Sequence, residues 1–164
     1  MKILAFDTSS SYCSIALWID GEILSRSILA EQQHSELLLP ILQELLAKSE
    51  LTLAQLDGIA FGAGPGSFTG LRIACGVAQG LAFGSGLPVI GISTLEALAQ
   101  QAGANNVITA IDARMGEIYH AAYIKSADNW ENVSTPILCL PRYAPLMTGD
   151  NWVGCGSGFD KYSD

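Results

Sequence analysis

Residues 62–86, GAGPGSFTGLRIACGVAQGLAFGSG, decide the fold, because ten of the seventeen glycines in the chain lie between Gly58 and Gly91. The stretch follows a short apolar run, Ile-Ala-Phe at residues 59–61. After Gly70, apolar residues recur at the spacing of an α-helix. The pattern therefore predicts a strand, a tight glycine loop and a helix.

Glycine also interrupts the predicted helix, at Gly76, Gly80 and Gly84, which are four residues apart. Each interior glycine costs a helix about 1 kcal/mol relative to alanine. Close approach of another backbone or side chain is the simplest reason for a helix to carry this cost. We therefore expect something to approach this face of the helix closely.

Two interpretations of the loop compete. A glycine loop that opens a helix can present backbone N–H groups to a phosphate at the positive end of the helix dipole. Neither a Walker pattern nor GxGxxG fits, because Gly64 is followed by Pro65 and no GK[ST] closes the loop. A packing or docking surface is therefore the favoured interpretation.

Composition limits the classes of function. The chain has 164 residues, 49% of them hydrophobic, which suffices for one full domain or for a small lobe and part of another. Its 8 basic and 16 acidic residues give a net charge of −8, which argues against holding nucleic acid alone. The four cysteines form no CxxC pair, which favours reduced thiols and argues against a zinc site. No apolar run has the length of a signal-peptide core or a membrane helix, so we expect a soluble cytoplasmic protein.

The remaining segments predict a mixed α/β chain. Strands are expected at residues 3–7, 13–19 and 22–30, with an Asp-Gly hairpin turn between the second and third. A leucine-rich helix follows at residues 35–47, and beyond the glycine-bearing helix come a strand at 87–91 and a helix at about 93–102. The first lobe therefore has the order βββαβαβα, and further strands follow at 107–111 and 117–124.

The leucine-rich helix has a wider apolar stripe than contact with a single sheet requires. We predict that part of the stripe remains uncovered and docks a partner, with the glycine face of the neighbouring helix as a shallow groove. The residues concerned are Leu38, Leu39, Leu42, Leu45 and Leu46 in the first helix and Gly76 and Gly80 in the second.

Two acids outline an internal duplication. Asp7 and Asp112 each end an apolar strand, each is followed by a turn, and a second strand comes at the same offset, with Ser14 and Tyr119 both seven residues beyond the acid. The alternative is coincidence, since strand, acid, turn and strand are common in α/β proteins.

The acids are also the best candidates for chemistry. Asp7 with Thr8 and Ser9, and Asp112 in the second half, can hold a magnesium-bound water and meet nucleotide phosphates. An Asx turn explains Asp7 equally well. No catalytic nucleophile with a base in reach is recognisable, and the two histidines have no metal-binding spacing. We therefore predict no catalytic residue and no metal site.

Three stretches resemble the bacterial TsaB (YeaZ) family: ILAFDTS at residues 3–9, FGAGPGSFTGLR at residues 61–72 and IDARMGE at residues 111–117. The resemblance implies the actin-like ATPase fold, which is built of two RNase H-like lobes. Residues 1–103 would form one complete lobe, and residues 104–164 the beginning of a second. Family members usually continue further, so we expect an incomplete second lobe, in either a fragment or a naturally short version.

The resemblance also implies a function. Members of the family take part in making N6-threonylcarbamoyladenosine at position 37 of tRNAs that read codons starting with A. They are non-catalytic partners of a TsaD-type catalytic relative, joined by a TsaE-type ATPase, and ATP and metal belong to those partners. Association would use the first-lobe helices, with Arg72 beside the leucines and glycines named above. We expect a homodimer alone, tRNA contact only through the complex, no cofactor and no membrane.

A different class of function remains open as the alternative. Sugar- and acetate-kinase-like phosphotransferases belong to the same superfamily, and Asp7, Thr8 and Asp112 are the residues that would serve such a reaction. Nucleotide binding with and without magnesium separates the two hypotheses.

Overall fold

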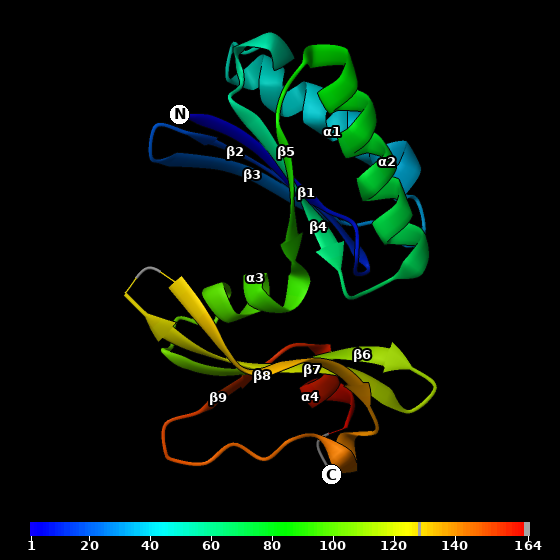
Figure 1. Ribbon diagram of the computed structural model, residues 1–164. Coiled ribbons are helices and arrows are strands. Elements are labelled where there is room, and N and C mark those ends of the chain that lie inside the picture. Colours follow the sequence, from blue (N-terminus) through cyan, green and yellow to red (C-terminus); the bar gives the residue numbers. More distant parts are fainter. Residues whose placement is uncertain (128, 163–164) are drawn as a thin grey trace. The chain divides into compact units, whose positions relative to one another are not determined.

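The computed structural model describes residues 1–127 and 129–162. The chain divides into two compact units, Met1–Ile92 and Ser93–Asp164, here called the first and second lobes. Each lobe contains its own β-sheet (Figure 1). No helix in the described ranges combines the length and the apolar character needed to cross a bilayer.

The first lobe is a five-stranded sheet with the order β3-β2-β1-β4-β5. Strands β1, β2 and β3 pair antiparallel, and β4 pairs parallel to β1. This is the RNase H-like arrangement that the resemblance implied. The elements are β1 (Lys2–Asp7), β2 (Tyr12–Ile19), β3 (Glu22–Leu29), α1 (His34–Lys48), η1 (Leu53–Gln55), β4 (Gly58–Gly64), α2 (Phe68–Ser85) and β5 (Val89–Ser93).

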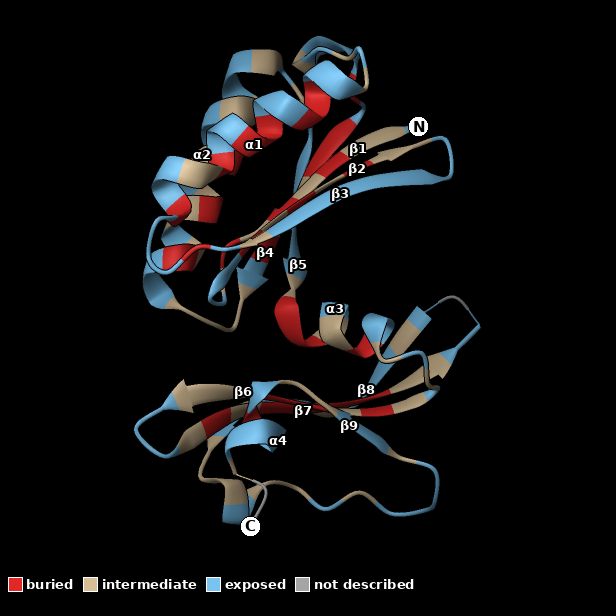
Figure 2. Ribbon diagram, turned by 180° about the vertical axis from the view of Figure 1, so that it is seen from behind, coloured by how far each residue is buried: buried red, intermediate tan, exposed pale blue. Residues whose placement is uncertain are grey.

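Alternation in the strands decides which face is covered. Leu4 pairs with Leu17 and Phe6 with Ile15, and all four side chains are buried. Directly opposed residues on paired strands point to the same face, and this face packs against α1 and α2 in one core (Figure 2). The two helices therefore lie on the same side of the first sheet.

The second lobe repeats the strand order in its sheet, β8-β7-β6-β9, which corresponds to β3-β2-β1-β4. Strands β6, β7 and β8 again pair antiparallel, and β9 pairs parallel to β6. The duplication outlined by the two acids therefore extends to the sheet. The elements are α3 (Thr94–Gln101), β6 (Asn106–Arg114), β7 (Glu117–Ser126), β8 (Asn129–Cys139), η2 (Pro141–Tyr143), β9 (Val153–Cys155) and α4 (Ser157–Lys161).

The duplication has a different register at its two hairpins. Asp7 pairs with Ser14, as the common offset predicts, whereas Asp112 pairs with Ile118 and Tyr119 pairs with Ile111. A bulge near the end of β6 causes the shift. The expected equivalence of Ser14 and Tyr119 is therefore wrong by one residue.

Helix α3 packs with the second lobe rather than the first. Leu95 and Ala99 of α3 are fully buried against Val107, Ala121 and Tyr123 of the second sheet. The expected boundary after residue 103 had placed this helix in the first lobe, and the structure divides the chain before it. An amphipathic pattern shows that a helix has a buried face but does not identify the sheet that covers it.

Candidate functional site

The first candidate site is the turn after β1, where the Asp7 side chain holds its own backbone. One carboxylate oxygen, Oδ1, accepts hydrogen bonds from the Ser9 backbone N–H at 2.8 Å and from the Ser9 hydroxyl at 2.7 Å. This is the Asx turn that stood as the structural alternative to phosphate or magnesium binding. Asp7 and Ser9 therefore satisfy each other within the turn.

Thr8 is fully buried and serves the packing of the glycine loop. Its hydroxyl donates to the Gly70 carbonyl at 2.6 Å, and none of the residue is exposed to solvent. The predicted contact between this hydroxyl and a nucleotide phosphate is therefore wrong. The sequence shows a hydroxyl residue after the acid, but no local pattern indicates that the glycine loop buries Thr8.

The glycines of the loop are explained by this same turn. A Cβ atom added at Gly70 would lie 1.7 Å from the Thr8 carbonyl oxygen, and one at Gly62 would lie 1.7 Å from Oδ2 of Asp7. A Cβ at Gly66 would lie 2.7 Å from the Cβ of Ser9. These glycines therefore admit the β1 turn, which supports packing over a phosphate cradle as the reason for the loop.

The second candidate acid, Asp112, is held by the end of the described chain. Its carboxylate accepts hydrogen bonds from Lys161 Nζ at 2.7 Å, Tyr162 OH at 3.0 Å and the Arg114 N–H at 3.0 Å. The Lys161 ammonium, together with the other two donors, holds the pKa of Asp112 below its usual value. Asp7 and Asp112 thus belong to separate lobes, and each is bonded within its own.

The sequence predicts no metal site, because its two histidines lack metal-binding spacing. In residues 1–127 and 129–162, no three His, Cys, Asp or Glu side chains gather as a ligand set. That observation concerns protein ligands alone, so the absence of a cofactor stays a prediction.

Most of the predicted docking leucines belong to the core. Leu38 and Leu45 are fully buried, and Leu42 and Leu46 are 2% and 8% exposed. Only Leu39, 43% exposed, is available to a partner. The stripe is wide because α1 packs on the sheet beneath it and also against α2 beside it, so the prediction is wrong for the other four.

The outer face of α2 is open in the described chain, so its docking role stays a prediction. Gly76 and Gly80 are exposed, and within the described chain no atom lies within 4 Å of a Cβ built at either position or at Gly84. Phe83, on the same helix, is 95% exposed. The helix therefore carries glycine and an uncovered phenylalanine where the chain itself packs nothing.

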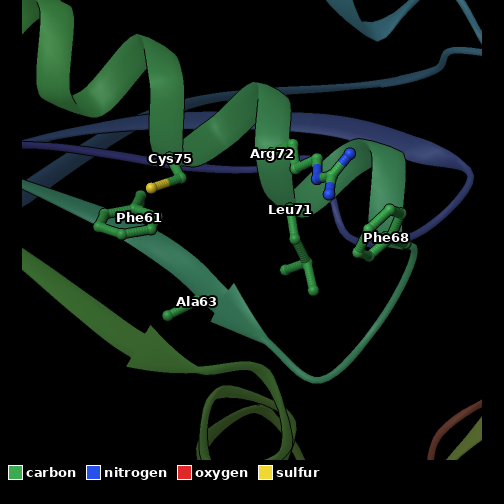
Figure 3. A pocket seen from close by; sticks show the side chains of 6 residues that line it. All are labelled: Phe61, Ala63, Phe68, Leu71, Arg72 and Cys75. Atoms are coloured by element: carbon green, nitrogen blue, oxygen red, sulfur yellow. The ribbon is translucent and has the colours of Figure 1, made fainter.

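A shallow apolar hollow, which we call the α2 hollow, lies between α2 and β4 (Figure 3). It has a volume of about 340 Å³ and includes Arg72, whose guanidinium lies 3.9 Å from the centre of the Phe68 ring. Sequence reasoning missed it, because its members come from separate elements and only their meeting forms a site. The lining residues are Phe61, Ala63, Phe68, Leu71, Arg72 and Cys75.

His120 is a buried titratable group that the sequence did not single out. It lies in β7 between Ala110 and Ile137 on the neighbouring strands and is 2% exposed. Its Nδ1 has no hydrogen-bond partner in the described parts of the chain. Burial lowers the pKa of the imidazole, since the charged form loses its hydration.

The chain has close relatives among known proteins. It is 42% identical to the tRNA threonylcarbamoyladenosine biosynthesis protein TsaB of Escherichia coli, over the whole chain and 74% of that protein. It is 43% identical to the TsaB of Haemophilus influenzae, over 99% of the chain and 75% of that protein. The chain belongs to the TsaB family.

A solved structure and a family model agree with this assignment. The structure titled YeaZ from Pseudomonas aeruginosa superposes with a TM-score of 0.92 at 40% identity, covering 99% of this chain and 78% of that one. Residues 24–143 match the model of the family described as TsaD, tRNA N6-adenosine threonylcarbamoyltransferase. This TsaB-family chain therefore shares its fold with that YeaZ protein and a sequence domain with a transferase family.

Proposed function

We propose that this TsaB-family chain is a non-catalytic subunit of the complex that forms N6-threonylcarbamoyladenosine at position 37 of tRNAs reading codons that start with A. Its partners are a TsaD-type catalytic relative and a TsaE-type ATPase. ATP and metal are bound by those partners. The names of the E. coli and H. influenzae relatives support the pathway.

The outer face of α2 is the observation that carries the proposal. Gly76 and Gly80 leave open space on the helix, while Leu39 of α1 and Phe83 of α2 are exposed. Glycine in a helix interior lowers stability, and an exposed apolar patch favours association. A face of this kind fits a helix of a related first lobe, in a homodimer of this chain or in a heterodimer with the TsaD-type relative.

The state of the candidate acids supports a non-catalytic role. A catalytic or phosphate-binding group must direct free polar atoms toward a substrate. Thr8 donates its hydroxyl inside the fold, Asp7 bonds Ser9, and Asp112 accepts three hydrogen bonds from its own lobe. Each of these groups therefore already makes hydrogen bonds within its own lobe.

The charge of the chain supports tRNA contact only through the complex. A net charge of −8 repels a phosphate backbone, and neutralising phosphates requires clustered Lys and Arg. The basic surface must then come from a partner. We expect the isolated chain to show no salt-dependent tRNA binding in a filter assay.

Co-expression with a TsaD-type protein tests the proposal. The two chains should co-purify and, with a TsaE-type ATPase, restore threonylcarbamoyladenosine formation that the TsaD-type protein lacks alone. Leu39→Asp should abolish co-purification by placing a charge in an apolar interface, and Gly76→Leu should abolish it by filling the open space. Neither variant should melt below the unchanged chain, because both positions are external, and Gly76→Leu should gain some stability through helix propensity.

Val133→Asp is the matched control, since Val133 is an exposed apolar residue of the second lobe. It should leave co-purification intact. Loss of association in all three variants would place the contact elsewhere, as would variants that unfold. Magnesium-dependent nucleotide turnover by the chain alone, abolished in Asp7→Ala, would favour the phosphotransferase alternative instead.

A further inference from the structure

The α2 hollow lies on a different flank of α2 from the glycines. Leu71 and Cys75, four residues apart, border the hollow, and Gly76 follows Cys75 directly. One residue corresponds to about 100° of rotation around an α-helix. In Figure 3, the Cys75 side chain points toward the Phe61 ring, and Leu71 extends away from α2. Leu71 and Cys75 therefore border the hollow on a different flank from Gly76 and Gly80, and Arg72, four residues before Gly76, lies at the boundary between the two surfaces.

Gly91 of β5 keeps the edge of the hollow open. A Cβ atom at this position would lie 2.8 Å from the Cβ of Ala63 and 3.5 Å from the Phe61 ring, and both residues line the hollow. Gly91 does not have the positive φ that favours glycine elsewhere in the chain. Space rather than backbone conformation therefore explains glycine here, and a side chain from outside the lobe can reach across it.

β5 is an edge strand of the first sheet. It is the last strand in the order β3-β2-β1-β4-β5, and Val89, Ile90 and Ile92 are exposed. Its sequence, VIGIS, contains no charged residue. Natural edge strands usually carry charge, proline or a bulge that prevents further pairing, and the opposite edge, β3, does contain Glu22 and Arg26. β5 lacks this charge protection.

Arg72 indicates the charge of the occupant. It is the one charged residue lining the hollow, and its guanidinium is placed over Phe68. Among residues 1–127 and 129–162, Arg72 forms no ion pair with a carboxylate, and neither do Lys2, Arg114, Lys125 and Arg142. Arg72 is distinguished from these by its place beside the apolar α2 hollow, in a chain of net charge −8. A guanidinium beside an apolar site is complementary to a carboxylate.

We propose that β5 and the α2 hollow bind an extended, acid-bearing segment of another protein. The segment adds as a strand to the free edge of β5 and passes a bulky apolar side chain over Gly91 into the hollow. Its carboxylate binds Arg72. Main-chain pairing supplies affinity in such strand addition, and pockets for alternate side chains supply specificity. This site is additional to the proposed helix-mediated complex and does not depend on it.

A phage-displayed library of random heptapeptides, selected on the full chain, tests the proposal. Enriched peptides should carry Leu, Ile or Phe two positions from Asp or Glu, since side chains two apart on a strand share a face. Synthetic copies should bind measurably in fluorescence anisotropy. Copies with alternate N-methylated residues should bind at least tenfold more weakly in the register that removes the pairing N–H groups.

Three variants locate the peptide. Ala63→Leu fills the hollow from an exposed position and should weaken binding at least tenfold, and Arg72→Glu should do the same while Arg72→Lys retains most affinity. Ala97→Leu, which enlarges an exposed alanine of α3 in the second lobe, is the matched control and should change nothing. Thermal melts establish that all variants fold.

Several results would overturn the proposal. The first is a selection that enriches no motif, and the second is peptide binding that is unaffected by Ala63→Leu or by N-methylation. If Ala63→Leu instead abolishes self-association of the chain, the occupant is a second copy. The test is separable from that of the proposed function. Ala63→Leu should leave co-purification with the TsaD-type relative intact, whereas Leu39→Asp should leave peptide binding intact.

Discussion

The two lobes have the same strand order but different coverings. In the first lobe, α1 with 15 residues and α2 with 18 lie on one face of the sheet. In the second lobe, α3 with eight residues contacts Val107, while Gly158 of α4, a helix of five, lies against Ala110. Residues three apart on a strand point to opposite faces. A repeated topology therefore fixes the strand pairing, whereas the helices that cover the sheet, and the surfaces they expose, can differ between the lobes.

Both lobes use small residues to bring the first strand and a later helix together. In the first lobe, Gly70 of α2 approaches the Thr8 carbonyl. In the second lobe, Gly156 and Gly158, at the start of α4, approach Ala110, and the Asp112 N–H donates to the Ser157 hydroxyl. The acids near the ends of β1 and β6 are likewise bonded within their own lobes, Asp7 to Ser9 and Asp112 to Lys161 and Tyr162. The duplication therefore preserves this packing junction, whereas the helices described in residues 93–127 and 129–162, α3 with eight residues and α4 with five, are shorter than α2 with 18.

The largest effects should come from filling these junctions. A Cβ at Gly70 would lie 1.7 Å from the Thr8 carbonyl oxygen, and one at Gly156, whose φ is 109°, would lie 2.3 Å from that of Ala110. Gly70→Ala and Gly156→Ala should each cost about 3 kcal/mol, the first in the first lobe and the second in the second. Urea unfolding of chains that keep either Trp18 or Trp130 as the single tryptophan, with the other two of the three replaced by Phe, measures each lobe separately by fluorescence.

The matched control for this comparison is Gly76→Ala. Nothing in the described chain lies within 4 Å of a Cβ at Gly76, so this variant should not destabilise the first lobe. An equal loss of unfolding free energy in Gly70→Ala and Gly76→Ala would contradict the junction argument. If each junction variant lowers the free energy of unfolding equally at Trp18 and at Trp130, the two lobes unfold as one unit instead.

The sequence predicted the first lobe well because its signals are local. Alternation, the Asp-Gly turn and the glycine loop each act within a few residues, and the observed β1, β2, β3 and α1 differ from the expected segments by one or two residues. β8 was not predicted, since Asn129–Cys139 is largely exposed and has no regular apolar alternation. Its place comes from pairing with β7 over a long stretch, which no local pattern encodes.

The site residues were less predictable, because their roles depend on what lies opposite them. An acid followed by hydroxyls fits both a phosphate turn and an Asx turn, and the burial of Thr8 decides against the phosphate. A wide leucine stripe indicates how much of α1 is covered. Whether the sheet, α2 or a partner covers it depends on the tertiary structure, which the stripe does not encode. The cost of glycine in a helix is intrinsic, so Gly76 and Gly80 pointed to a close neighbour, but the described chain places nothing within 4 Å of a Cβ there and the partner contact stays a prediction.

A smaller effect should distinguish the lobes in their response to pH. The pKa of His120 is lowered in the folded chain by burial, so the unfolded chain binds the proton more readily. Above the unfolded-state pKa of about 6.5, His120 is neutral in both states and does not reduce the free energy of unfolding. Below that pH the free energy of unfolding falls by at most about 1.4 kcal/mol per pH unit, because only the unfolded chain binds the proton readily. Unfolding at pH 7.5 and 5.5 should differ more at Trp130 than at Trp18.

His120→Leu serves as the control for the pH effect. It removes both the titrating group and the buried Nδ1 that lacks a partner in the described residues. The difference between the two pH values should shrink at Trp130 and stay unchanged at Trp18. A profile that keeps its slope in this variant would assign the pH dependence to another group.

The smallest expected effect has opposite signs in two measurements, which makes it informative about the α2 face. A Cβ at Gly80 meets nothing within 4 Å in the described chain, so Gly80→Ala should stabilise the isolated first lobe by roughly 0.8 kcal/mol through helix propensity. If the glycine is kept so that a partner helix can approach, the added methyl group must weaken association in the same variant. Sedimentation beside a urea melt measures both quantities on one sample. A variant that is more stable and associates as before would show that the open space at Gly80 serves no contact, and it would remove this residue from the docking face while leaving Leu39 and Gly76 to be judged separately.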